Sequence, residues 1–300
     1  MKTALLSLLS LVGLSLAVPV EIDARDSVGV PEDVFQNLKL FSQYAAATYC
    51  TNNNDSPNSK ITCGANACPM VEAANTTSII EFQHTLITDD TGYVAIDQTR
   101  QLIVVAFRGT QAIQNFIDDN AFIKLPFLEM CLTCLVHRGF LNSWLEIRDQ
   151  VLGAVSSAKS QHPTFELVVV GHSLGGAIAS LAAAELRKEG NTAALYTYGS
   201  PRVGNAPFAD LVTDQAGGNY RVTHTDDIVP RLPPISFDYA HISPEYHIEQ
   251  GDTNINASNI NLYTGPINIG GNLGELTFSA VAHLYYFANI GACSPGIGIY

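Results

Sequence analysis

The stretch that most constrains the fold of this chain is residues 168–178, which read VVVGHSLGGAI. Three β-branched residues lead through Gly171 and a histidine to Ser173, and further glycines lead into the alanine-rich run AIASLAAAELR. This order predicts a strand, a sharp turn and a helix in direct succession. It also fits G-x-S-x-G in the strand–turn–helix context that presents a nucleophilic serine. We interpret Ser173 as a nucleophile, with an idle serine in a tight turn as the alternative.

Strand and helix patterns alternate through the middle of the chain. Helical periodicity marks residues 31–49 and 139–157, and apolar strand patterns mark 101–107, 165–170, 194–198 and 220–225. Alternation of this kind predicts an α/β fold with a mostly parallel sheet covered on both faces. At 300 residues and 47% hydrophobic content, the chain can bury one large core. We expect a single catalytic domain over residues 29–300.

The first residues have the layout of a secretory signal peptide. Residues 1–17 read MKTALLSLLSLVGLSLA, with one lysine, an apolar run and a small residue at Ala17. Residues 18–28 are polar and lack periodicity, which predicts a short propeptide or a disordered lead. No other apolar run reaches the roughly 18 residues that cross a bilayer. The sequence therefore predicts a secreted, extracellular protein without integral membrane insertion.

Export favours disulfides for the six cysteines, because the extracellular compartment is oxidising. Six cysteines permit many pairings, but closeness in sequence favours Cys63 with Cys68 and Cys131 with Cys134. Cys50 would then pair with Cys293. A redox C-x-x-C is the alternative for residues 131–134. The glycosylation pattern Asn-x-Ser/Thr occurs at Asn54, Asn75 and Asn256.

The charge balance argues against a nucleic-acid partner. The formal net charge is −13, whereas phosphate binding needs clustered lysine and arginine. We expect a monomer. A serine nucleophile that is activated by a base implies no metal and no cofactor.

A serine hydroxyl needs a base, and the base needs a carboxylate that fixes its tautomer. In α/β-hydrolases these partners follow in the order serine, acid, histidine. Asp226 and Asp227 follow a predicted strand directly, as an acid at the mouth of a site should. The downstream histidines are His224, His241, His247 and His283. A helix beginning beneath Ser173 would also offer the Leu174 amide to an oxyanion.

Several motifs, in order, resemble those of fungal class 3 lipases, which are secreted α/β-hydrolases acting on acylglycerols. They include LIVVAFRGT, VGHSLGGAIASLAAAELR, YTYGSPRVGNAPFA, RVTHTDDIVPRLPP and AHLYYF, and the resemblance spans residues 31–293. It implies Ser173 as nucleophile, Asp227 as acid, His283 as base and Thr110 as second oxyanion donor. It also supports the disulfide pairing above. Asp226 remains an alternative acid, and His247 an alternative base, since the family usually has SPEYW where this chain has SPEYH.

The segment after FRGT bears on the substrate. Ile113, Phe116 and Ile117 would form one apolar face of a short helix, as expected of a lid over an acyl site. Burying three such side chains is worth roughly 5 to 9 kcal/mol, and reversing a 1:99 equilibrium takes roughly 5.5 kcal/mol. Contact with lipid would therefore suffice to open such a lid. An ordinary surface helix is the alternative.

Two departures from the family pattern bear on this lid. Phe116 stands where tryptophan is common in the family, and Thr110 stands where many lipases have serine. We expect a triacylglycerol lipase acting at an oil–water interface. The alternatives are a feruloyl or other phenolic esterase, a mono- and diacylglycerol lipase, and a non-catalytic lipid-binding protein.

Overall fold

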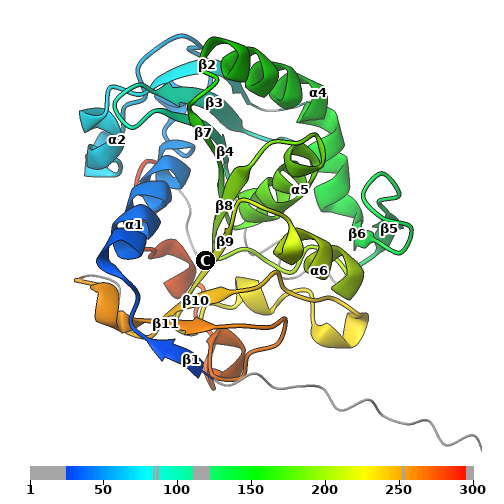
Figure 1. The fold of residues 1–300 in the computed structure, drawn as a ribbon. Coiled ribbons are helices and arrows are strands. Elements are labelled where there is room, and N and C mark those ends of the chain that lie inside the picture. The colour runs from blue at the N-terminus through cyan, green and yellow to red at the C-terminus, as the bar shows by residue number, and fades with distance from the viewer. Residues whose placement is uncertain (1–24, 84, 86–87, 111–121, 252–253, 295–300) are drawn as a thin grey trace, which may run out of the picture.

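The computed structural model describes residues 25–83, 85, 88–110, 122–251 and 254–294. Nine of its strands form one sheet in the order β1-β11-β10-β9-β8-β7-β4-β3-β2 (Figure 1). These strands are β1 (Arg25–Val28), β2 (Thr77–Phe82), β3 (Gly92–Asp97), β4 (Leu102–Phe107), β7 (Glu166–His172), β8 (Ala193–Tyr198), β9 (Asn219–His224), β10 (Glu245–Ile248) and β11 (Ile260–Tyr263). A small hairpin pairs β5 (Lys124–Pro126) with β6 (Leu135–His137).

The centre of the sheet is parallel and its edges are antiparallel. Strands β4, β7, β8, β9 and β10 run in the same direction, so their carboxyl ends meet at one edge. Antiparallel pairs add β3 and β2 on one side and β11 and β1 on the other. In open α/β sheets, ligands bind at the carboxyl edge of the parallel strands.

Helices cover both faces of the sheet (Figure 1). Helix α1 (Glu32–Ala47) lies on one face, and α4 (Arg138–Gln161), α5 (Leu174–Lys188) and α6 (Ala206–Asp214) lie on the other. The short α2 (Pro69–Ala73) packs beside α1. This is the α/β-hydrolase fold that the sequence predicted.

Strand β4 shows why the central strands are apolar throughout. Ile103, Val105 and Phe107 belong to the core beneath α4 and α5, whereas Val104 and Ala106 belong to the core beneath α1. A strand buried on both faces has no polar side to alternate with. Its sequence therefore reads as one continuous apolar run.

The face that carries α1 also has a row of aromatic rings. Tyr196 of β8 stacks on Tyr220 of β9 with 4.2 Å between ring centroids, and the ring centroid of Tyr220 lies 5.5 Å from that of Tyr246 of β10.

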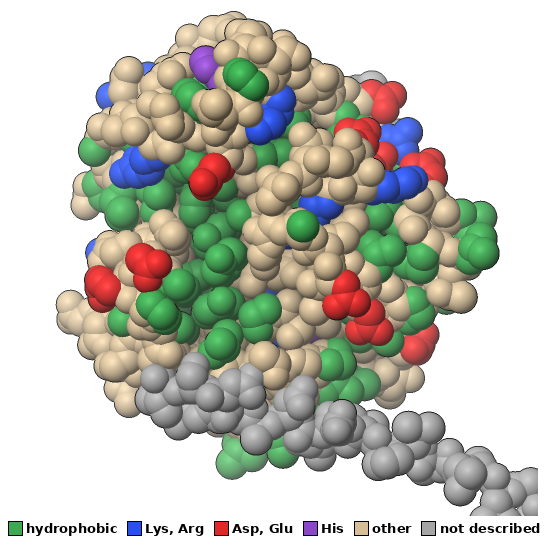
Figure 2. Space-filling model, viewed as in Figure 1, with side chains coloured by type: hydrophobic (Ala, Val, Ile, Leu, Met, Phe, Trp, Pro, Cys, Tyr) green, Lys and Arg blue, Asp and Glu red, His purple; other side chains and the backbone are tan. Residues whose placement is uncertain are grey.

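Figure 2 shows a band of hydrophobic side chains across the middle of this view, with charged groups scattered around it.

Part of the N-terminal lead is ordered. Residues 25–28, within the predicted propeptide or disordered lead at 18–28, form β1, which pairs antiparallel with β11. A propeptide at 18–28 stays a prediction. The backbone hydrogen bonds of an open sheet edge can order a short segment whatever its hydrophobic pattern. The predicted signal peptide lies outside the described residues. In the described part of the chain, no helix is long and apolar enough to cross a membrane.

The expected disulfide pairing is confirmed. Cys63 is bonded to Cys68, Cys131 to Cys134, and Cys50 to Cys293 across 243 residues of sequence. The last bond fastens the segment after α1 to the C-terminal segment.

Candidate active site

Ser173 occupies the sharp bend between β7 and α5. Its backbone has φ 58° and ψ −130°, in a region that residues with a Cβ rarely adopt. The flanking glycines are needed for close approach: a Cβ on Gly171 would lie 2.1 Å from the Gly175 carbonyl oxygen. The Ser173 amide donates to the Tyr198 carbonyl at 2.9 Å, which fixes the bend to the end of β8. The strand, turn and helix order predicted from the sequence is thus present.

Asp227 and His283 meet in the interior at the same edge of the sheet. Asp227 follows β9, and His283 lies in the short helical turn η7 (Ala282–Leu284). Their side chains are fully buried, and His283 Nδ1 lies 2.8 Å from Asp227 Oδ2. The other carboxylate oxygen accepts the Val229 amide at 2.9 Å, so the acid is held from both sides.

This contact determines which nitrogen of His283 is basic. An ionised carboxylate can only accept, so Nδ1 carries the proton in the bond to Asp227. In the neutral ring Nε2 then has a free lone pair. Among the described residues, Nε2 is buried and has no hydrogen-bond partner. That nitrogen is available to take a proton from a hydroxyl.

The three residues lie at one place in the molecule. The His283 ring lies 4.6 Å, centroid to centroid, from that of His172, the neighbour of Ser173. A Cβ on Gly199 would lie 2.8 Å from His283 Cε1 and 2.9 Å from Asp227 Oδ2, and Gly199 follows the residue that accepts the Ser173 amide. Serine, imidazole and carboxylate therefore gather at the carboxyl edge of the sheet.

The alternative acid and base have different surroundings. Asp226 is half-buried and accepts from the Thr277 hydroxyl at 2.7 Å. His247 lies in β10, where its Nδ1 is 2.9 Å from the Thr223 hydroxyl and its Nε2 is 3.5 Å from Glu275. His224 ends β9, and its ring nitrogens face two backbone carbonyls, those of Ala282 and Gly251. The carboxylate that faces His247 is that of Glu275, and neither alternative takes part in the contact between His283 and Asp227.

Leu174 and Thr110 are the expected oxyanion donors. Leu174 is the first residue of α5, where backbone N–H groups have no acceptor within the helix. Thr110 follows Gly109, where a Cβ would lie only 2.7 Å from the Ser173 Cβ. Both backbone segments thus adjoin Ser173. The lid residues Ile113, Phe116 and Ile117 lie outside the described residues.

Tyr286 and Asn272 contact Asp227 and were missed by sequence reasoning. The Tyr286 hydroxyl donates to Asp227 Oδ2 at 2.5 Å, and burial raises the pKa of this phenol well above its ordinary value. The Asn272 side-chain amide donates to the carbonyls of Thr225 and Asp227 at 2.9 and 2.8 Å. Tyr286 stands in the AHLYYF motif, three residues after His283, which is the one signal that pointed to it.

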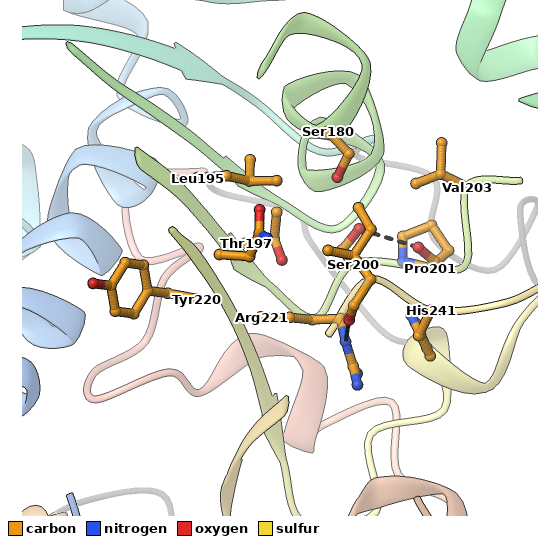
Figure 3. Close-up of a pocket in the computed structure, with 11 residues that line it drawn as sticks. Ser180, Leu195, Thr197, Ser200, Pro201, Val203, Tyr220, Arg221 and His241 are labelled. Carbon is orange, nitrogen blue, oxygen red and sulfur yellow. Dashed lines mark hydrogen bonds between the residues drawn. The ribbon is translucent and has the colours of Figure 1, made fainter. Parts of the chain in front are cut away.

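A small cavity between the sheet and α5 is separate from this site. Figure 3 shows its lining residues Ser180, Leu195, Thr197, Ser200 and Arg221 around the space between β8, β9 and α5. Its volume is about 10 Å³, room for a single water molecule rather than an acyl chain. Neither Ser173, Asp227 nor His283 lines it.

The three glycosylation patterns differ in exposure. Asn75 and Asn256 are exposed, and glycosylation at these positions stays a prediction. The Asn54 side chain is only 2% exposed, which argues against the predicted glycan there, because a bulky glycan needs an accessible acceptor. The short sequence pattern carries no information on burial.

Comparison with known proteins gives consistent matches. A family model for class 3 lipases matches residues 104–237, and one for the lipase 3 N-terminal region matches residues 5–79. Secreted mono- and diacylglycerol lipase 1 of Fusarium solani is 42% identical, over 97% of this chain and 89% of its own length.

Two solved structures are similar over nearly all of their own chains. The crystal structure of a mono- and diacylglycerol lipase from Aspergillus oryzae has 40% identity and a TM-score of 0.83, covering 88% of this chain and 100% of its own. A triacylglycerol lipase whose catalytic centre is described as a serine protease triad has 31% identity and a TM-score of 0.76, covering 89% of this chain and 99% of its own.

Proposed function

Because the chain belongs to the class 3 lipase family, we propose that it is a serine hydrolase of acylglycerols in which Ser173, His283 and Asp227 form the catalytic triad. The observation that carries this proposal is the buried 2.8 Å contact between His283 and Asp227, beside the bend at Ser173. It leaves His283 Nε2 as the available base. A protein that only bound lipid would need no such arrangement.

The geometry supports the following sequence of steps. Ser173 attacks the ester carbonyl while His283 Nε2 takes its proton, and the Leu174 and Thr110 amides stabilise the oxyanion. His283 then gives the proton to the departing alkoxide, which leaves an acyl-serine. Water activated by the same nitrogen releases the fatty acid. Asp227 holds the ring in the tautomer that makes these transfers possible.

For the substrate, we favour mono- and diacylglycerols over the triacylglycerols that the sequence favoured. The support is comparative: the relatives described as mono- and diacylglycerol lipases share 42% and 40% identity with this chain, and the triacylglycerol lipase shares 31%. The relatives that are described as secreted also support an extracellular site of action.

The test compares wild-type protein with Ser173→Ala on emulsions of monoolein, diolein and triolein, with methyl ferulate as a phenolic ester. We expect the wild type to release fatty acid fastest from monoolein and diolein. Ser173→Ala should lower kcat by roughly a millionfold while adsorption to the emulsion persists. Ser180→Ala is the matched control, since this buried serine lies in the helix that follows Ser173 and donates its hydroxyl to the Gly176 carbonyl.

Two results would contradict different parts of the proposal. Near-normal activity of Ser173→Ala would exclude this serine as the nucleophile. Faster release from triolein than from diolein would restore the triacylglycerol assignment, and preferential cleavage of methyl ferulate would move the protein among the phenolic esterases.

A further inference from the structure

A buried chain of three hydrogen bonds links residues that are far apart in the sequence. His172 Nε2 lies 2.8 Å from the His283 carbonyl oxygen, and His172 Nδ1 lies 2.6 Å from the Tyr49 hydroxyl. The Gly109 amide donates to the same hydroxyl at 3.1 Å. His172 and Tyr49 are 0% and 2% exposed. We call this chain the Tyr49–His172 bridge.

The direction of each bond follows from the chemistry of its ends. A carbonyl oxygen only accepts, so His172 Nε2 must carry a proton toward His283. Burial and the nearby His283 lower the pKa of His172 well below its ordinary value, so the ring is neutral and Nδ1 is an acceptor. Tyr49 therefore donates its hydroxyl proton to Nδ1, and its oxygen accepts the Gly109 N–H. Each of the three donors in the bridge has one acceptor, and this is the one placement of the protons that satisfies all three hydrogen bonds.

Both ends of the bridge adjoin the candidate active site. At one end, the carbonyl belongs to His283 itself, whose side chain bonds Asp227. At the other end, Gly109 immediately precedes Thr110, the proposed oxyanion donor. The packing is too tight for a side chain, because a Cβ on Gly109 would lie 2.5 Å from the Tyr49 oxygen and 2.7 Å from the Ser173 Cβ. His172 immediately precedes Ser173.

We propose that Tyr49 and His172 are positioning residues that hold the base and the oxyanion segment in fixed relation to Ser173. The proposal rests on the proposed function, because it assigns these contacts to the alignment of that triad. A buried donor without an acceptor costs more free energy than one hydrogen bond contributes on balance. We therefore expect that breaking one bond of the bridge moves the segment that has lost its partner. A misplacement of about 1 Å at a catalytic group can lower the rate by roughly a hundredfold.

The experiment measures kcat and KM of Tyr49→Phe, His172→Phe and the double variant on the soluble ester p-nitrophenyl butyrate. Each single variant keeps an aromatic ring and loses the polar atoms of its link. We expect Tyr49→Phe to lower kcat by roughly tenfold to a hundredfold and to leave KM within about twofold, because the loss arises in the transition state. The double variant should lose little more than the worse single variant, because both substitutions break the same chain.

Tyr93→Phe is the matched control. The Tyr93 hydroxyl is also fully buried and donates to a carbonyl, that of Tyr44, at 2.7 Å, but it has no place in the bridge. It should keep the wild-type kcat. Any of three results would overturn the proposal. Tyr49→Phe could keep the wild-type kcat, or the double variant could lose kcat by the product of the two single losses. In the third, Tyr93→Phe would lose as much kcat as Tyr49→Phe. Should His172→Phe not fold, the kcat and KM of Tyr49→Phe beside Tyr93→Phe decide the question.

Labelling with an organophosphonate separates this proposal from the proposed function. Wild-type protein that forms no adduct at Ser173 would refute the serine hydrolase itself. Equal labelling rates of the wild type and Tyr49→Phe would refute only the proposal that Tyr49 and His172 are positioning residues. We expect Tyr49→Phe to be labelled more slowly by the same factor as its loss in kcat.

Discussion

Asp226 and Asp227 are adjacent in sequence but differ in what they contact. Asp227 is buried between the Val229 amide, the Tyr286 hydroxyl and His283 Nδ1, whereas Asp226 is half-buried and bonds the Thr277 hydroxyl. Converting the buried carboxylate to an amide places an N–H group where only an acceptor fits. The imidazole of His283 is then held in the wrong tautomer, as happens when the triad aspartate of a serine protease is replaced by asparagine.

We therefore expect Asp227→Asn to lower kcat on a soluble ester by roughly ten-thousandfold. Asp226→Asn should stay within about threefold of wild type, because the bond of its carboxylate to the Thr277 hydroxyl is exposed and a net hydrogen bond contributes little. Steady-state kinetics of the two variants measure the difference. Equal losses would show that the loop as a whole matters rather than one carboxylate.

The sequence revealed these residues to different degrees. Ser173 and Leu174 follow from a local pattern, because strand, turn and helix are consecutive. Asp227 and His283 are 56 residues apart, and the sequence alone offered two acids and several histidines. Only the family resemblance selected the pair. Tyr49 and His172, which are 123 residues apart, had no signal at all, since hydrogen bonds between distant segments leave no periodicity in the chain.

At the scale of elements, the central strands and long helices were predictable and the edges of the sheet were not. The predicted helix at 31–49 is α1 (Glu32–Ala47), and the strand at 101–107 is β4 (Leu102–Phe107). Both have long apolar patterns because they are buried. β1, β10 and β11 have four residues each, too few for a period to be recognised, and are ordered by pairing.

Two glycines in helices should respond oppositely to alanine. A Cβ on Gly175 at the start of α5 would lie 2.2 Å from the Phe107 carbonyl oxygen, whereas a Cβ on Gly153 in α4 meets nothing within 4 Å. We expect Gly175→Ala to lower the free energy of unfolding by roughly 1–3 kcal/mol through overpacking. Gly153→Ala should raise it by about 0.5–1 kcal/mol, because alanine favours the helix.

Denaturant unfolding of both variants measures these changes. Gly175→Ala should also lower kcat, since the clash pushes the start of α5 away from β4 and moves the Leu174 amide. A Gly175→Ala variant with wild-type stability and activity would mean that α5 does not pack against β4 as closely as described.

At the scale of the whole molecule, buried ionisable groups make stability depend on pH in two opposing ways. Burial lowers the pKa of His172, His241 and His247 below the ordinary 6.5, so the folded state keeps these rings neutral. The unfolded chain binds protons there as the pH falls below about 6.5, and stability is lost toward acid. Asp90 acts in the other direction, because burial raises its pKa from 3.8 to about 6.

For Asp90, the folded state binds more protons than the unfolded state between pH 3.8 and about 6, so its contribution to stability is present at acid pH and is lost as the pH rises through that window. Asp90→Asn removes this loss and keeps an acceptor for the Thr88 hydroxyl, which lies 2.5 Å from the carboxylate. The free energy of unfolding of the variant should match that of wild type near pH 4 and exceed it by up to roughly 3 kcal/mol above pH 7.

Unfolding midpoints of both proteins across this pH range test the prediction. The stability of the variant should rise more steeply from acid to neutral pH than that of the wild type, because the opposing contribution of Asp90 is gone. Parallel curves would show that folding does not raise the pKa of Asp90.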